Sequence, residues 1–177
     1  CLLVVGGSQG AKIFDKIVKN VIVNLSKKSK IKIIQQTHKS NTDNLKNIYD
    51  EAEIENIIFD FEENLVDLIS QSDLCITRAG ASTLAELSIM NKPFLTIPLV
   101  SAKDNHQFEN ANFYQNLGCC WIMSQKDFNE VNLEKFLDHI IMNKSEYNIK
   151  KNNLEKHNFQ NSWNDINQKI LETINEN

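Results

Sequence analysis

The sequence predicts an α/β protein with a Rossmann-like parallel sheet of about six strands flanked by helices. Short apolar runs, each as long as a buried strand, alternate with segments whose apolar residues recur every three or four positions. This alternation is typical of βαβ units. Glycines also follow apolar runs at Gly6–Gly7 and Gly80, where a strand would turn into a helix.

The expected strands are short and almost wholly apolar, as strands covered by helices on both faces usually are. The first begins at once with CLLVV, and most of the later ones are followed by a helical pattern. We expect strands at Cys1–Val5, Ile31–Gln35, Ile57–Phe59, Leu74–Thr77, Phe94–Ile97 and Cys119–Met123.

The helix after the first strand is the clearest, because Ile13, Ile17, Val21 and Leu25 fall on one face of it. Such a face is buried when a helix packs on a sheet. Further helices are expected at Thr42–Ala52, Asn64–Ser70, Ser82–Met90 and Asn105–Asn116, with two or three more from Asn132 onward.

One domain is expected over residues 1–160, followed by a C-terminal helix over residues 161–177. The tail after Tyr147 is polar, but it carries an apolar stripe that favours a packed helix over disorder. The stripe consists of Leu154, Phe159, Trp163, Ile166 and Ile170. Because the chain starts inside a strand and without Met, we interpret it as part of a longer protein.

Composition narrows the class of protein. A chain of 177 residues that is 41% hydrophobic suits one domain with a full core, and its net charge of −4 gives no reason to expect a nucleic-acid partner. No apolar run approaches the ~18 residues of a membrane span, and no signal peptide is visible, so a cytosolic setting is expected. Cys1, Cys75, Cys119 and Cys120 lack C-x-x-C spacing, so we expect small buried hydrophobes rather than a metal site or disulfides. No cofactor is expected.

The stretch VVGGSQGAKIF places Gly6, Gly7 and Gly10 between a strand and a helix. Glycine lets the backbone turn sharply and approach a ligand, and the N–H groups of the helix start then face an anion. Ser8 adds a hydroxyl donor. The stretch has neither the G-K-[ST] of a P-loop nor the G-x-G-x-x-G of a dinucleotide fold. A tight turn without a ligand remains the alternative.

The stretch TRAGASTLAEL repeats the order of strand, glycine turn and helix. Gly80 permits close approach, and Ser82 or Thr83 can cap the helix. Glu86 is either a surface carboxylate favoured by the helix dipole or an acceptor for a pair of sugar hydroxyls. Arg78, the only arginine in the chain, precedes the turn.

The stretch IPLVSAKDNHQFENA ends a strand at Pro98 and begins a helix at Asp104 or Asn105. His106 and Gln107 fall in the first helical turn, and a glutamine amide offers the donor and the acceptor that a sugar hydroxyl needs. A polar helix start without a ligand is the alternative. Together these strand ends indicate a ligand that carries both phosphate and hydroxyl groups, as a nucleotide-sugar does.

These motifs resemble the MurG family of bacterial N-acetylglucosaminyltransferases. The likeness rests on GGSQGA, on the R-x-G-A-x-T-x-x-E block and on the N-H-Q that ends the third loop, and it extends from Leu2 to about Trp121. It implies the C-terminal, donor-binding domain of a GT-B glycosyltransferase, whose N-terminal domain is absent from this sequence. The helix at 161–177 would then pack back toward that domain.

The resemblance also implies site residues. Ser8 and Gln9 would lie at the diphosphate, the backbone around Phe61 and Glu62 would meet the uracil, and Glu86 would take the ribose hydroxyls. It further implies that Gly80, Ala81 and Ser82 lie against the phosphates, that Arg78 lines the same loop, and that Gln107, with His106 beside it, reads the N-acetylglucosamine.

Two positions depart from the family pattern. Glu62 stands where family members often carry an apolar residue, which matters little if the backbone makes the contact. Asn91 stands where many relatives have glycine at the end of a helix, and asparagine also tolerates the left-handed conformation that such an end requires.

The function implied is the donor half of an inverting transferase that moves N-acetylglucosamine from UDP-N-acetylglucosamine to the lipid-linked muramoyl-pentapeptide, at the cytoplasmic side of the bacterial inner membrane. In the family, the N-terminal half carries the acceptor site, the presumed base and a membrane patch. No catalytic residue is therefore expected in this chain, which alone would be inactive. One alternative is a non-catalytic UDP-sugar-binding subunit that needs a membrane-anchored partner; another is a UDP-sugar epimerase, whose catalytic carboxylates and histidine find no place here.

Overall fold

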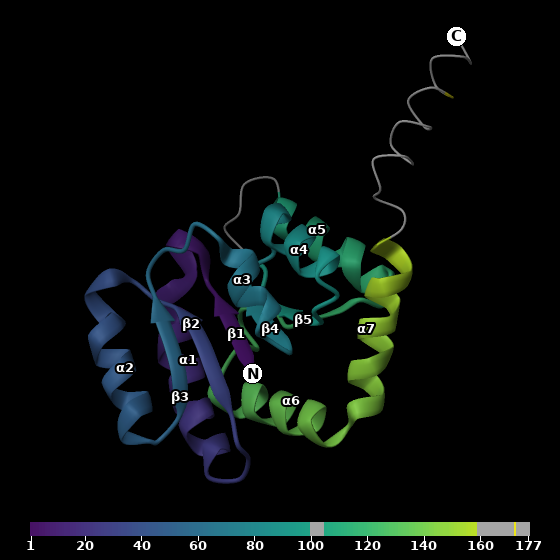
Figure 1. Cartoon of the computed structure of the whole chain (residues 1–177). Coiled ribbons are helices and arrows are strands. Elements are labelled where there is room, and N and C mark those ends of the chain that lie inside the picture. The colour runs from purple at the N-terminus through teal and green to yellow at the C-terminus, as the bar shows by residue number, and fades with distance from the viewer. Residues whose placement is uncertain (100–104, 159–171, 173–177) are drawn as a thin grey trace.

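The computed structural model describes residues 1–99, 105–158 and 172, and at 8–11 and 158 it describes the backbone alone. Its centre is a six-stranded sheet in the order β3-β2-β1-β4-β5-β6. Every neighbouring pair of strands is parallel. Helices surround the sheet (Figure 1). The predicted fold class is therefore confirmed.

The strands are close to those predicted. One matches at both ends, and the others differ by one or two residues at an end. They are β1 (Leu2–Val5), β2 (Lys32–Gln36), β3 (Glu55–Phe59), β4 (Leu74–Thr77), β5 (Phe94–Thr96) and β6 (Cys120–Ile122).

Helices connect the strands and follow the last one. They are α1 (Gly7–Ser26), the short 3-10 helix η1 (Lys39–Asn41), α2 (Thr42–Glu51), α3 (Leu65–Ser70), α4 (Ala81–Ile89), α5 (His106–Asn116), α6 (Glu130–Met142) and α7 (Lys144–Asn158). Within the described ranges, no helix combines the length and the apolar character that crossing a bilayer requires. The predicted helix at 161–177 and most of its apolar stripe lie outside the described residues, whereas Leu154 is buried on α7.

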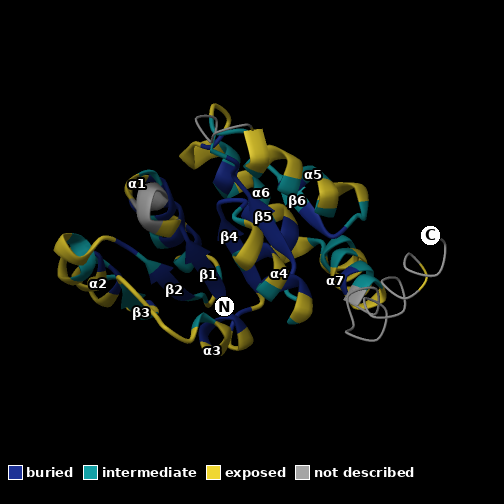
Figure 2. Ribbon diagram, turned by 90° about the horizontal axis from the view of Figure 1, so that it is seen from above, coloured by how far each residue is buried: buried dark blue, intermediate teal, exposed yellow. Residues whose placement is uncertain are grey.

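The sheet separates two apolar cores. Leu2 and Val4 of β1 pack with α1, α2 and α6, whereas Leu3 and Val5 pack with α3, α4, α5 and α7. Side chains of a strand alternate between the two faces of the sheet. Because helices cover both faces, both sets of side chains are apolar, and β1 is a continuous apolar run. Figure 2 shows the buried strands between helices whose outer faces are exposed. The predicted face of α1 is confirmed, with Ile17, Val21 and Leu25 buried and Ile13 partly so.

The end of α4 confirms the expectation for Asn91. Its φ of 52° is left-handed, and its N–H donates to the carbonyl of Ser88 over 3.0 Å. The next N–H, of Lys92, donates to the carbonyl of Leu87 over 2.9 Å. This pair of bonds is a Schellman motif, in which asparagine takes the place usually held by glycine.

The cysteines are free thiols, and Cys75, Cys119 and Cys120 are buried as predicted, whereas Cys1 is half-buried. Burial raises the pKa of Cys119 to about 11 and that of Cys120 to about 12. These thiols therefore stay protonated at neutral pH and pack as small apolar side chains.

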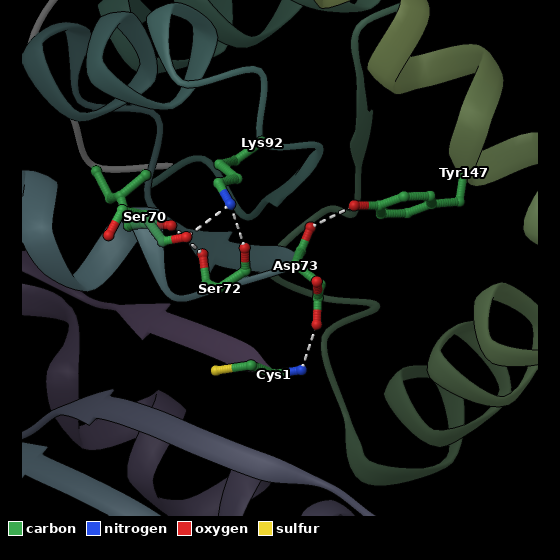
Figure 3. A network of polar contacts seen from close by, with 7 residues as sticks. Cys1, Ser70, Ser72, Asp73, Lys92 and Tyr147 are labelled. Atoms are coloured by element: carbon green, nitrogen blue, oxygen red, sulfur yellow. Dashed lines mark hydrogen bonds and ion pairs between the residues drawn. The ribbon is translucent and has the colours of Figure 1, made fainter.

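Polar contacts close the amino edge of the sheet, where the strands begin (Figure 3). The ammonium of Lys92 donates to the carbonyls of Ser70 and Ser72 over 2.9 and 2.6 Å, and the hydroxyl of Tyr147 donates to the carbonyl of Asp73 over 2.9 Å. The amino group of Cys1 lies 2.6 Å from the Asp73 carboxylate. A cavity of about 630 Å³ opens beside them, lined largely by apolar residues from β1, β4, α1 and α6.

Candidate ligand-binding site

The predicted motifs meet at the opposite, carboxyl edge of the sheet. β1 and β4 are neighbours in the middle of the sheet, yet the helices that follow them pack on opposite faces, α1 with one core and α4 with the other. Such a reversal opens a crevice between the two loops, and ligands of open α/β sheets bind there. The site is therefore placed by topology, at the ends of β1 and β4.

The glycine loop after β1 has the backbone shape of an anion site. Gly6 has φ −87° and ψ −11°, and Gly7 has φ +63°. This change of hand between successive residues turns neighbouring N–H groups toward one concave side. α1 begins at Gly7, so its first N–H groups add to that side. Only the backbone is described at Ser8, Gln9 and Gly10, so the roles of the first two side chains stay predictions.

The loop after β4 leads directly into α4. The helix begins at Ala81 with Gly80 as its N-cap, and no side chain caps it. The prediction that Ser82 or Thr83 caps this helix is therefore wrong. Gly80 is already extended (φ −71°, ψ 133°) and its carbonyl accepts the N–H of Leu84, so the helix starts one residue earlier than expected and both hydroxyl residues lie inside it. A Cβ on Gly80 would meet no atom within 4 Å, which leaves room for a ligand beside this helix start.

Glu86 lies further along α4 and is half-exposed. Its carboxylate makes no hydrogen bond or ion pair with any residue that the structure describes. The geometry is compatible both with a surface carboxylate and with an acceptor for ligand hydroxyls.

Arg78 is only 8% exposed and lies under the loops rather than in the solvent. Its Nη1 donates to the carbonyl of Ile97 over 2.8 Å and to Oε1 of Gln125 over 3.2 Å, and the guanidinium lies 5.1 Å from the ring centroid of Phe14. Burial lowers its pKa, but a guanidinium keeps its charge at neutral pH. Nε is buried without a hydrogen-bond partner among the described atoms. Arg78 thus ties together the loops that follow β4, β5 and β6.

The start of α5 is attached to the same loops. Oε1 of Gln107 accepts the N–H of Leu99 over 2.9 Å, and Nδ2 of Asn110 donates to the carbonyl of Ala79 over 3.0 Å. The N-cap is Asn105, which confirms the predicted helix start to within one residue, and His106 beside Gln107 is exposed. The role of Gln107 in reading a sugar stays a prediction, and its oxygen already holds a loop.

The loop after β3 carries the two residues predicted to meet a base. Phe61 is 72% exposed, and its N–H donates to Oδ1 of Asp60 over 2.9 Å. The carboxylate of Glu62 accepts the N–H of Asn64 over 3.0 Å. One oxygen of the Glu62 carboxylate is thus bonded within its own loop, and the contact of a base with the backbone here stays a prediction.

Sequence reasoning missed Gln36, the last residue of β2. Its Oε1 accepts the N–H of Gly7 over 3.1 Å, and its Nε2 donates to the carbonyl of Asp60 over 3.1 Å. One signal was present, because a polar Q-Q-T follows the apolar start of this strand. The loops that Gln36 joins are far apart in sequence, and the signal alone does not identify them.

Among the residues that the structure describes, no group of three or more histidine, cysteine and carboxylate side chains could hold a metal ion. The polar groups at this edge include amides, backbone N–H groups and a guanidinium, which suit an anion and hydroxyl groups.

Comparison with known proteins defines the family. Residues 1–170 match the Glycosyltransferase family 28 C-terminal domain. The chain belongs to this family. It is 53% identical over 176 residues to the UDP-N-acetylglucosamine--N-acetylmuramyl-(pentapeptide) pyrophosphoryl-undecaprenol N-acetylglucosamine transferase of Pelagibacter ubique (strain HTCC1062), covering 99% of this chain and 49% of that protein. The chain thus spans about half the length of the curated relatives it matches.

Solved structures agree with this assignment. Acinetobacter baumannii MurG superposes with a TM-score of 0.75 at 26% identity, over 88% of this chain and 45% of that one. The UDP-GlcNAc 2-epimerase from Neisseria meningitidis bound to UDP-GlcNAc superposes with a TM-score of 0.64 at 16% identity, over 99% of this chain and 44% of that one, and shares the fold alone. The resemblance to the MurG family and the GT-B fold class are therefore confirmed.

Proposed function

We propose that this chain is the UDP-N-acetylglucosamine-binding half of an inverting glycosyltransferase, which transfers N-acetylglucosamine to the lipid-linked muramoyl-pentapeptide in peptidoglycan synthesis. The observation that carries the proposal is the 53% identity to a relative named for this transfer. The meeting of the motif loops at the β1–β4 crevice supports it, because this is where open α/β sheets bind nucleotides.

The diphosphate would lie between the glycine loop and the start of α4. Backbone N–H groups of the loop from Gly6 to Gly10, apart from that of Gly7, which donates to Gln36, would face it from one side, with Ser8 and Gln9. The helix start at Gly80, Ala81 and Ser82 would face it from the other side. The buried charge of Arg78, which forms no ion pair with a described carboxylate, adds attraction for an anion.

The rest of the donor would extend from this point in two directions. The uracil would contact the backbone of Phe61 and Glu62, and the free carboxylate of Glu86 would accept hydrogen bonds from the ribose hydroxyls. The N-acetylglucosamine would lie toward α5, within reach of the Gln107 amide and beside His106.

The chemistry that these residues can supply is stabilisation of the leaving group. As the sugar–phosphate bond breaks, negative charge grows on the UDP, and preorganised N–H groups and helix N-termini meet it without reorganising. We assign no catalytic base to this chain. The base, the lipid-linked acceptor and the peripheral attachment to the cytoplasmic side of the inner membrane would belong to the other half of the enzyme.

Titration calorimetry of the 177-residue chain tests this proposal. UDP and UDP-N-acetylglucosamine should both bind, whereas ADP, as a control for general diphosphate binding, should bind far more weakly. The chain alone should transfer no sugar. A chain that is folded by circular dichroism and releases no heat with millimolar UDP contradicts the proposal, and equal affinity for ADP would indicate a site for diphosphates in general.

A further inference from the structure

The end of β2 lies between the two loops that the proposed donor site uses at its nucleotide end. β2 pairs with β1 on one side and β3 on the other, so its last residue neighbours both the glycine loop and the loop at Asp60. Side chains of a strand alternate in direction, and the last residues of β2 use both directions for polar contacts.

Gln36 bonds to both loops through one amide group. Its Oε1 accepts the N–H of Gly7 over 3.1 Å, and its Nε2 donates to the carbonyl of Asp60 over 3.1 Å. An amide has an acceptor and donors on one planar group, so holding one bond orients the other. The N–H of Gly7 lies at the change of backbone hand from Gly6, so this bond also fixes the orientation of the peptide group within the anion-binding turn.

The other side of the strand end is anchored to helices. The carboxylate of Asp15 on α1 accepts from Nε2 of Gln35 over 3.0 Å, from Oγ1 of Thr37 over 2.6 Å and from Nδ2 of Asn41 over 3.0 Å. The hydroxyl of Tyr49 on α2 donates to Oε1 of Gln35 over 2.7 Å. Asp15, Gln35 and Tyr49 are buried, so these bonds are protected from water, and the strand end forms a fixed base for Gln36.

We propose that Gln36 is a positioning residue that couples the two ends of the nucleotide site, by holding the diphosphate loop and the uracil loop at the spacing that UDP requires. The inference rests on the proposed function, which places the uracil and the diphosphate at these loops. Gln36 acts through the two backbones and contacts neither end of the ligand. A joined ligand benefits from this spacing more than its separate parts do, because either part alone needs only one loop in place.

The test uses Gln36→Met, which keeps the length of the side chain and removes both hydrogen bonds. Gln36→Asn is the second variant, because it keeps the amide but is too short to span the two loops. The matched control is Gln71→Met, in an exposed glutamine whose Nε2 donates to the carbonyl of Asp67 over 3.1 Å next to the amino edge. Calorimetry measures the affinity of each chain for UDP, uridine and pyrophosphate. NMR measures the rate of hydrogen exchange of the Gly7 N–H without ligand.

In Gln36→Met, UDP affinity should fall about tenfold, as expected for two lost hydrogen bonds, while uridine and pyrophosphate each change less than about threefold. Exchange of the Gly7 N–H should speed up about tenfold. Gln36→Asn should show the same preferential loss of UDP, and Gln71→Met should match the unchanged chain in every measurement.

Each contrary result has one meaning. If the wild-type chain binds no UDP, this result contradicts the proposed function and, with it, this inference. If the unchanged chain binds UDP and both Gln36 variants bind it equally well, the inference alone fails. It also fails if UDP, uridine and pyrophosphate all weaken by the same factor, because Gln36 would then support the loops without coupling them.

Discussion

The two edges of one sheet are built differently. At the carboxyl edge, side chains such as Arg78, Gln36 and Gln107 bond to the backbones of neighbouring loops and leave helix starts facing the crevice. At the amino edge, Lys92 and Tyr147 bond to backbone carbonyls and close the turns beside an apolar cavity of about 630 Å³. The amino edge thus has an apolar cavity, whereas the carboxyl edge has the N–H groups and amides that suit an anion and hydroxyl groups.

Helix direction explains the difference. α1, α4 and α5 follow parallel strands, so their N-termini, with positive partial charge, lie at the carboxyl edge and their C-termini lie at the other. The ammonium of Lys92 accordingly rests on the carbonyls of Ser70 and Ser72, near the end of α3. An anionic ligand is therefore favoured at the carboxyl edge, where the N–H groups converge.

The largest expected effect on binding concerns Glu86. If its carboxylate accepts both ribose hydroxyls, Glu86→Ala should weaken UDP by ~1.5–3 kcal/mol, because a charged acceptor is lost. The unchanged chain should prefer UDP to 2′-deoxy-UDP, and the variant should not. Asp73→Asn, at the amino edge, is the control and should leave both affinities unchanged. Equal binding of the two nucleotides by the unchanged chain would make Glu86 a surface carboxylate.

Two glycines with positive φ, one at each edge of the sheet, allow the edges to be compared directly. Gly7 and Gly118 have φ of +63° and +69°, so alanine at either position should cost roughly 1–2 kcal/mol of unfolding free energy. Gly118→Ala should cost at least as much as Gly7→Ala, because its Cβ would lie 2.6 Å from Nδ2 of Asn153.

Only Gly7→Ala should also weaken UDP binding, since of these two glycines Gly7 alone lies at the carboxyl edge. Denaturant unfolding and calorimetry on both variants measure the two quantities. A loss of UDP affinity in Gly118→Ala equal to that in Gly7→Ala would show that binding follows stability and that the edges do not differ as proposed.

The smallest expected effect concerns the sugar. Gln107→Ala should leave UDP affinity nearly unchanged. It should remove the extra binding free energy of UDP-N-acetylglucosamine relative to UDP, which we expect to be about 1 kcal/mol for one amide. His106→Ala should do less, because adjacent helical positions point about 100° apart. Calorimetry with both ligands separates the cases.

The bond between Gln107 and Leu99 gives this experiment a clear alternative. Equal losses for UDP and UDP-N-acetylglucosamine in Gln107→Ala would mean that the residue holds only its loop. A larger sugar-specific loss in His106→Ala would mean that the other face of α5 meets the sugar.

The sequence by itself determined the helices and strands, and it indicated the strand ends at which a ligand is expected. Strand and helix follow from local periodicity, and glycine or asparagine marks the turns, so β4 and the left-handed Asn91 were both predictable. The start of α4 was not, because Ser82 and Gly80 are both acceptable N-caps and local preference does not choose between them.

Only the tertiary structure decided which loops become neighbours. Gln36 meets Gly7 and Asp60 because the sheet order places β2 between β1 and β3, and Asp15 meets Gln35 because α1 packs beside that strand. Arg78 was predicted to line the phosphate loop, and the structure adds that it lies buried against Phe14 and Ile97. These contacts join segments separated by many residues, and local propensity contains no information on strand order, so the sequence identified the polar residues but not their partners.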